Sequence, residues 1–232
     1  QVIAAQGDTA GSEFRVNTHI IDNQRSPSIA MDADGDFVIT WTSKGQVDPG
    51  YEVYAQRYTA DGIKAGSEFL VNTETSNRQQ GSSIAMDADG DFVIAWESLN
   101  QDGSLFGTYA QRYTADGSTV GSEFLVNTET SNNQRGSSVA MDADGDFVIA
   151  WSSDHVDSSY DVFAQRYTAD GSPAGSEFQV NTFMTLNQEF ASIAMNADGD
   201  FAITWTDSFQ DGDANGVYAQ RYTADGIKAG SE

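Results

Sequence analysis

The chain is one short unit written four times in tandem. The string GSEF begins at positions 11, 66, 121 and 175, and GSE returns at position 230. The repeats therefore cover residues 11–65, 66–120, 121–174 and 175–229, with no linker between them. Tandem copies of a short unit bury a shared core by stacking, so the pattern predicts a single repeat domain over residues 1–232.

Each repeat reads as four β-strands. In the first repeat, Ser28–Asp32 and Asp36–Trp41 flank a tight DADG turn, in which Gly35 supplies the positive φ of a short hairpin. Val53–Tyr58 is rich in β-forming residues and ends at a TADG turn, and Glu68–Thr73 returns from that turn. No stretch of the chain carries the apolar stripe of a helix. The sequence therefore predicts an all-β fold.

Four-stranded units of this length in tandem are typical of a β-propeller. The last repeat has three strands, from Ser192 to Tyr222, and residues 13–18 match the fourth. We expect a four-bladed propeller of four-stranded antiparallel sheets, closed by pairing of Phe14–Thr18 with Val217–Tyr222. An open solenoid with polar caps is the alternative architecture. Residues 1–10 resemble a degraded QRYTADG, which leaves open that the chain is a window of a longer array.

The composition limits the partners of the chain. Thirty-five acidic residues against 11 basic ones give a net charge of −24, which repels nucleic acid and anionic lipid surfaces. No apolar run is long enough to cross a bilayer, so we expect no membrane insertion. The absence of cysteine excludes disulfides, thiol nucleophiles and zinc-thiolate sites.

The DADG turns place acidic residues at alternate positions around a glycine. This arrangement resembles half of a calcium loop, although the later acidic ligand of such loops is missing. The competing interpretation is a turn in which each aspartate caps its own backbone amides. Ca²⁺ is the one cofactor that the sequence suggests, and its candidate ligands are Asp32, Asp34, Asp36, Asp87, Asp89, Asp91, Asp142, Asp144, Asp146, Asp198 and Asp200.

The opposite end of the predicted ring carries the variable loops, where binding specificity usually resides. A tryptophan ends the second strand of each repeat, either as core between blades or as a platform for a sugar ring. A repeated glutamine either ties down its loop or contacts a ligand, and two copies of QDG offer an aspartate to a polyol. The candidate ligand-binding residues are Trp41, Trp96, Trp151, Trp205, Gln24, Gln79, Gln134, Gln188, Asp102 and Asp211.

The repeated AQRY motif supplies one arginine per repeat. A glutamate follows about eleven residues later, across the predicted hairpin, so we expect structural cross-strand ion pairs. The arginines are Arg57, Arg112, Arg166 and Arg221, and the glutamates are Glu68, Glu123, Glu177 and either Glu232 or Glu13.

Catalysis finds little support in the sequence. The two histidines, His19 and His155, stand at non-equivalent places and outside the repeated motifs. A site repeated four times is also an unusual place for chemistry that needs one asymmetric pocket. We therefore expect that the chain is not an enzyme.

The motifs GSEFxVNT, AMDADGDFVIAW and YAQRYTADG resemble a repeat of large secreted or surface proteins of bacteria, many of them cyanobacterial or marine. The resemblance implies an extracellular or cell-surface β-propeller without an assigned catalytic role. We expect a non-enzymatic, lectin-like module whose repeated weak sites bind a polysaccharide or glycoconjugate. The alternative is a structural or adhesive spacer that self-associates, with or without calcium.

Overall fold

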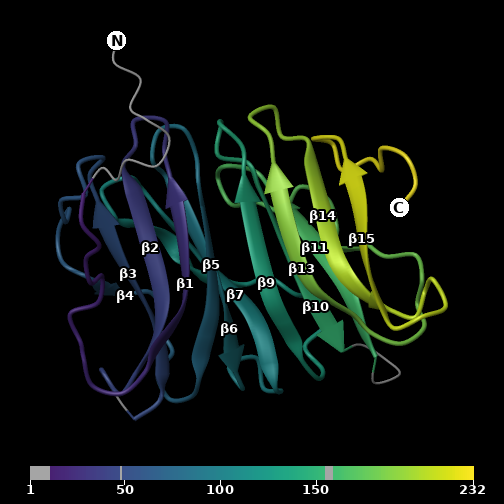
Figure 1. The fold of residues 1–232 in the computed structure, drawn as a ribbon, viewed down its shortest axis with the longest axis horizontal. Coiled ribbons are helices and arrows are strands. Elements are labelled where there is room, and N and C mark those ends of the chain that lie inside the picture. Colours follow the sequence, from purple (N-terminus) through teal and green to yellow (C-terminus); the bar gives the residue numbers. More distant parts are fainter. Residues whose placement is uncertain (1–10, 48, 155–158) are drawn as a thin grey trace.

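The structure is a computed structural model that describes residues 11–47, 49–154 and 159–232 (Figure 1). Residues 1–10, which resemble a degraded strand, and His155 lie outside the described residues. The described chain contains β-strands, turns and loops and no helix, as predicted, and hence no helix that could cross a membrane. Its strands form antiparallel sheets that stand side by side (Figure 1).

There is one sheet per repeat, in which the fourth strand lies at or beyond the boundary with the next repeat, and the strands of each sheet follow one another in chain order. The first strands are β1 (Gln24–Met31), β5 (Gln79–Met86), β9 (Gln134–Met141) and β13 (Gln188–Met195). The second strands are β2 (Phe37–Lys44), β6 (Phe92–Leu99), β10 (Phe147–Asp154) and β14 (Phe201–Ser208). The third strands are β3 (Tyr51–Tyr58), β7 (Phe106–Tyr113), β11 (Tyr160–Tyr167) and β15 (Asn215–Tyr222). The fourth strands are β4 (Phe69–Leu70), β8 (Thr119–Leu125) and β12 (Phe178–Gln179).

The fourth strands end earlier than predicted because an asparagine replaces part of the ladder. The backbone N–H of Val71 donates to the carbonyl of Val53 at 2.9 Å. The N–H of Val53 then donates to the side-chain oxygen of Asn72 at 2.8 Å, instead of to a backbone carbonyl. Asn181 does the same for Val162 at 2.8 Å. The chain thereby leaves the sheet early without orphaning a buried donor.

Neighbouring sheets pack a face of large side chains against a face of small ones. Between the second and third sheets, the small side chains are Val93, Ala95, Ala110 and Val126. The large ones that cover them are Phe147, Ile149, Trp151 and Tyr167. The equivalent residues meet at the other two junctions. We call the large side of each sheet its leading face and the small side its trailing face. This packing sets the order in which β1, β5, β9 and β13 contact one another.

The predicted ring closure is not found. The N-terminal segment lies against the first sheet, where the ring centroids of Phe14 and Tyr58 are 5.3 Å apart. The N–H of Thr18 donates to a carboxylate oxygen of Glu68 at 2.8 Å. Within the described chain, β15 ends a three-stranded sheet, and the first and last sheets lie at opposite ends of the molecule (Figure 1). The segment therefore packs on the leading face of the first sheet, through the contact of its Phe14 with Tyr58.

Two glycines allow the cost of a strained turn to be separated from the cost of crowding. Gly90 and Gly62 both have positive φ, +90° and +75°. A Cβ on Gly90 would lie 3.1 Å from the Cβ of Ala115 and 3.1 Å from a carboxylate oxygen of Asp32, whereas one on Gly62 would meet open space.

We expect Gly62→Ala to lower the free energy of unfolding by about 1 kcal/mol through backbone strain alone. Gly90→Ala should lower it by up to about 3 kcal/mol, because crowding between sheets adds to the strain. Urea denaturation of the two variants measures both losses. Equal losses would contradict the close packing of this turn.

Candidate functional site

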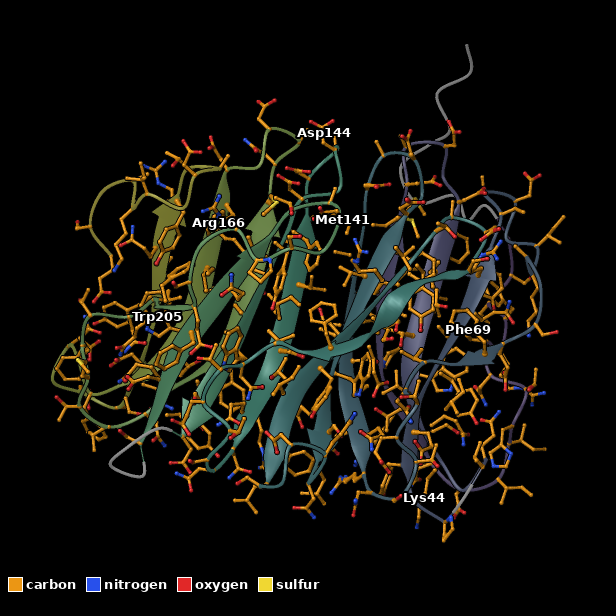
Figure 2. All side chains as sticks on the ribbon, turned by 180° about the vertical axis from the view of Figure 1, so that it is seen from behind. Lys44, Phe69, Met141, Asp144, Arg166 and Trp205 are labelled. Carbon is orange, nitrogen blue, oxygen red and sulfur yellow. The ribbon has the colours of Figure 1, made fainter. Side chains whose placement is uncertain are left out.

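The two ends of the molecule differ in chemistry. Asp144, in the turn after β9, lies at one end, and Lys44, where β2 ends, lies at the other (Figure 2). The predicted separation of the aspartate turns from the variable loops is therefore present in the structure.

The aspartates of the first end are bonded to backbone amides. An oxygen of Asp87 accepts hydrogen bonds from the N–H groups of Asp89 at 3.0 Å and Asp91 at 2.9 Å. An oxygen of Asp91 accepts from the N–H of Ala115 at 2.9 Å. The first, third and fourth repeats repeat this pattern. Over the described ranges no group of three or more histidine, aspartate and glutamate side chains gathers as a metal site requires. Calcium binding stays a prediction.

The fourth repeat has a neutral residue where the others have a charged one, which shows how the charge of these turns affects stability. Burial raises the pKa of Asp87, and the carboxylates of Asp91 and Asp89 raise it further, against the two backbone donors. A raised pKa means that the native state holds the proton more tightly, so the ionised group destabilises the fold above that pKa. In the fourth repeat Asn196 stands at the same position and accepts the same two bonds, at 3.1 and 2.9 Å.

We expect Asp87→Asn to raise the free energy of unfolding at pH 7 by up to about 1 kcal/mol, because the acceptor stays and the repulsion goes. The gain should shrink at high salt and fade as the pH drops through the raised pKa. Asn196→Asp is the matched reverse change and should destabilise. Thermal unfolding at two salt concentrations measures both, and a loss for Asp87→Asn at low salt would refute this account.

The four candidate tryptophans are core residues. Each indole is at most 4% exposed, which leaves no face for a sugar ring to cover. Each one stacks on an aromatic residue of the neighbouring third strand, with ring centroids 6.3 to 6.5 Å apart. The interpretation of Trp41, Trp96, Trp151 and Trp205 as ligand platforms is therefore wrong, because the leading faces need them as packing.

The glutamines and the QDG aspartates serve the loops on which they stand. The side-chain amide groups of Gln24, Gln134 and Gln188 donate to a carbonyl three residues earlier, at 2.7 to 3.1 Å. Gln79, their counterpart in the second repeat, is fully buried. Asp102 accepts from the N–H of Ser104 at 3.1 Å. Asp211 accepts from that of Asp213 at 3.2 Å. Their proposed contacts with a ligand stay predictions.

The expected arginine–glutamate pairs are not the contacts that these residues make. Arg112 donates to the carbonyl of Ala169 at 2.6 Å, in the third-strand turn of the next sheet. Arg57 and Arg166 reach the equivalent turns. Glu123 instead accepts from the N–H of Thr73 at 2.7 Å. Both side chains are long enough to reach a neighbouring sheet, so they join repeats rather than strands.

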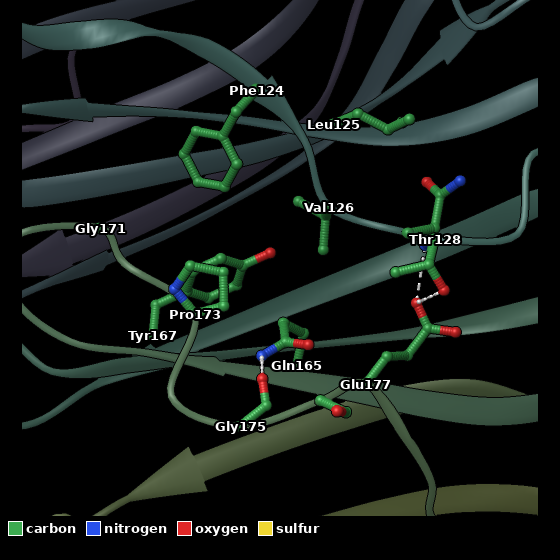
Figure 3. Close-up of a pocket in the computed structure, with 12 residues that line it drawn as sticks. Phe124, Leu125, Val126, Thr128, Gln165, Tyr167, Gly171, Pro173, Gly175 and Glu177 are labelled. Atoms are coloured by element: carbon green, nitrogen blue, oxygen red, sulfur yellow. Dashed lines mark hydrogen bonds between the residues drawn. The ribbon is translucent and has the colours of Figure 1, made fainter.

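A cleft of about 700 Å³ lies at such a junction (Figure 3). Phe124 and Val126 line it from the second sheet, and Tyr167, Pro173 and Glu177 line it from the third. Glu177 accepts from the N–H and the hydroxyl of Thr128, at 2.8 and 3.1 Å (Figure 3). Some of the polar groups that line the cleft are thus already engaged in hydrogen bonds that join two repeats.

The repeats differ from one another where the first strands begin. Each first strand carries a bulge whose central residue has positive φ, and the second and third repeats place Gly81 and Gly136 there. The fourth repeat has Phe190, with φ +60° and a side chain that is 74% exposed. A bulky residue in this conformation is strained, and such outliers cluster at functional sites.

Glu189 stands next to this strained residue. It is the only acidic residue at its position, where the other repeats have Arg25, Gln80 and Arg135. The side chain is half-buried, and burial raises the pKa of its carboxyl group. A carboxyl group that keeps its proton more readily is suited to act as a general acid.

A second carboxylate, on the second sheet, contacts the beginnings of two first strands. Glu97 is 8% exposed, and its oxygens accept from the amide of Gln80 at 2.9 Å and the N–H of Gly136 at 2.8 Å. In the first repeat the hydroxyl of Thr42 is enough to accept from Gly81, at 3.1 Å. The bulge contact therefore does not require a charge, and Glu97 adds one.

Arg135 and Tyr160 complete the group. Arg135 is exposed on β9, beside Gly136, and its guanidinium lies 4.4 Å from the ring centre of Phe106. Burial raises the pKa of the Tyr160 hydroxyl, which lies close enough to Arg135 and Glu189 to feel both charges. We call Glu97, Arg135, Tyr160, Glu189 and Phe190 the strand-start cluster.

Reasoning from the sequence missed this cluster because it searched for what the repeats share. Aligning the four repeats and asking where one copy departs in charge or size would have singled out Glu97, Glu189 and Phe190. Nothing in the linear sequence shows that these three side chains, from two different sheets, flank the same strand β9.

Comparison with known proteins identifies the fold. The sequence matches no protein family model and no curated protein. A thermostable family-43 glycoside hydrolase superposes with a TM-score of 0.52 at 13% identity, over 87% of this chain and 72% of the other. An endo-arabinase from Bacteroides thetaiotaomicron gives 0.52 at 15% identity, over 87% and 76%. A Hadza microbial sialidase gives 0.60 at 14% identity, over 88% of this chain but 45% of its own length.

These neighbours show a β-propeller fold, and they are enzymes. The expectations of a non-enzymatic lectin-like module and of a structural or adhesive spacer are therefore contradicted, since the fold is one that glycoside hydrolases use. The argument against catalysis assumed four equivalent sites. The strand-start cluster does not meet that assumption, because Glu97, Glu189 and Phe190 each occur in one repeat only.

Proposed function

We propose that this chain hydrolyses glycosidic bonds of polysaccharides at the strand-start cluster. The observation that carries the proposal is the placing of two unique carboxyl groups, Glu97 and Glu189, on either side of β9. Hydrolysis of a glycosidic bond needs one carboxyl group as acid and a second as base or nucleophile. The glycoside hydrolases that share the fold support the same chemistry.

The environments of the two carboxyl groups divide the roles. Glu189, with its raised pKa, donates a proton to the glycosidic oxygen as the bond to the anomeric carbon breaks. Glu97, whose oxygens accept hydrogen bonds from two N–H donors, serves as the partner that takes a proton from water or attacks that carbon. Water supplies the atoms that complete the two sugar products.

The other members of the cluster suit a sugar. The exposed ring of Phe190 offers an apolar face for the C–H groups of a pyranose or furanose. Arg135 can donate to hydroxyl groups or to a sugar carboxylate. We propose that the substrate lies outside the cell, where such polymers occur.

The experiment measures new reducing ends from a panel of neutral and acidic polysaccharides. We expect release from at least one substrate, and a loss on the order of 100-fold or more in kcat for Glu189→Gln and for Glu97→Gln. Glu74→Gln is the matched control, since Glu74 caps its own loop by accepting from the N–H of Ser76 at 2.6 Å. Activity should fall as the pH rises above the pKa of Glu189, because the acid then loses its proton.

The proposal would be contradicted if the chain released no reducing ends from any of the polysaccharides. Full activity of both glutamine variants would also contradict it. Melting curves of the variants keep a loss of activity distinct from a loss of folding.

A further inference from the structure

Among the residues that the structure describes, none supplies the two outer faces of the row of sheets with the neighbour that every inner face has. On the trailing side of the last sheet, Val217 is 81% exposed, whereas its counterparts Val53 and Val162 are fully buried. On the leading side of the first sheet, Ile29 is 57% exposed, whereas its counterpart Ile84 is 6% exposed. One large apolar face and one small apolar face are thus open at opposite ends.

The last sheet also has an open edge. In the first sheet, Tyr54 pairs with Leu70 and Ala55 with Phe69, which adds the fourth strand. In the last sheet Ala219, the counterpart of Ala55, is exposed, and the described residues supply no strand beside β15. An open edge with apolar side chains is a template for another strand.

Residues 13–18 have the sequence of that strand and already make half of its contacts. Phe14 packs on Tyr58 with ring centroids 5.3 Å apart, as Phe69 packs on Tyr113 at 5.5 Å. The carbonyl of Val16 accepts from Lys64 at 3.1 Å, as that of Val180 accepts from Lys228 at 3.0 Å. These are the contacts that a fourth strand makes with the sheet that follows it, and Figure 3 shows the equivalent aromatic pair, Phe124 and Tyr167, at an internal junction.

The contacts with a preceding sheet are missing. Val16 is half-buried, whereas Val71 and Val180, which lie between two sheets, are 4% and 0% exposed. Phe14 is 53% exposed. The segment therefore presents an unpaired strand edge and an apolar side, next to the open leading face.

We propose that two copies of this chain associate head to tail, with residues 13–18 of one copy as the fourth strand beside β15 of the other. The register follows from the internal junctions: Ala219 opposite Phe14, Tyr218 opposite Arg15, and the N–H of Val217 donating to Asn17. The trailing face of one copy then covers the leading face of the other. The junction repeats an interface that the chain already forms three times.

A second copy fits these surfaces better than the chain's own N-terminal segment. The first and last sheets lie at opposite ends of the row, so internal closure would require all three junctions to bend (Figure 1). A second copy needs no change at any junction. Such a contact joins unlike surfaces, so it produces a ring if the rotation closes and a filament if it does not.

Light scattering after gel filtration, over a range of protein concentrations, tests the proposal. We expect a mass of at least twice the 25.0 kDa of one chain, rising with concentration. Val217→Asp should raise the dissociation constant by about tenfold or more, because it places a charge in the middle of the buried contact. Its melting temperature in dilute solution should stay unchanged, since Val217 is exposed in the single chain.

Leu105→Asp is the matched control. Leu105 is 47% exposed in a loop of the second repeat, away from both outer faces, and its change should leave association intact. A single mass of 25.0 kDa at every concentration would overturn the proposal. Equal weakening by Leu105→Asp would also overturn it.

Cysteine cross-linking shows whether the strand beside β15 comes from a second copy or from the same chain. The chain has no cysteine of its own that would interfere. Arg15→Cys and Tyr218→Cys proteins, mixed and exposed to a mild oxidant, should yield a disulfide-linked heterodimer. The double variant should form oligomers linked between chains. A double variant that cross-links only within itself and keeps the mass of one chain would show that the chain closes on its own segment, against our proposal.

Discussion

The packing of a large apolar face on a small one is the constraint on which the structure depends. Each sheet presents Phe, Ile, Trp and Tyr on its leading side and Val and Ala on its trailing side. Two leading faces would overfill the space between sheets, and two trailing faces would leave voids. The sheets must therefore stack in one direction, and every outer face remains complementary to the opposite face of another row.

The short fourth strand joins this packing to the hydrogen bonds. One segment pairs with its own sheet through a backbone bond and an asparagine side chain, and it contacts the next sheet through an aromatic ring and a glutamate. Unfolding one repeat therefore exposes polar groups of its neighbour as well as its apolar surface. The buried asparagines Asn72, Asn127 and Asn181 are consequently part of the scaffold rather than of a binding site.

The strand-start cluster departs from the repeated scaffold at Glu97, Glu189 and Phe190. The bulge of each first strand fixes a positive φ whatever residue stands there, so Phe190 adopts a conformation that Gly81 and Gly136 adopt easily. Glu97 from the second sheet, and Glu189 and Phe190 from the fourth, flank the same strand, β9. The shared residues build the scaffold, and the residues on which our proposal rests are the exceptions. The same end is remote from the aspartate turns, whose charges are engaged with their own backbone.

The sequence by itself determined the repeat, the four strands of each unit and the tight turns between them. These follow from alternation and from glycines such as Gly35 and Gly90, whose positive φ is a local requirement. Only the tertiary structure decided which faces meet, that Trp96 is buried, that Arg112 reaches the next sheet, and that residues 13–18 rest on the first sheet. It also placed Glu97 and Glu189 around β9. Contacts between repeats depend on how sheets of nearly identical sequence fit together in space, and no spacing along a chain of near-identical copies distinguishes one such contact from another.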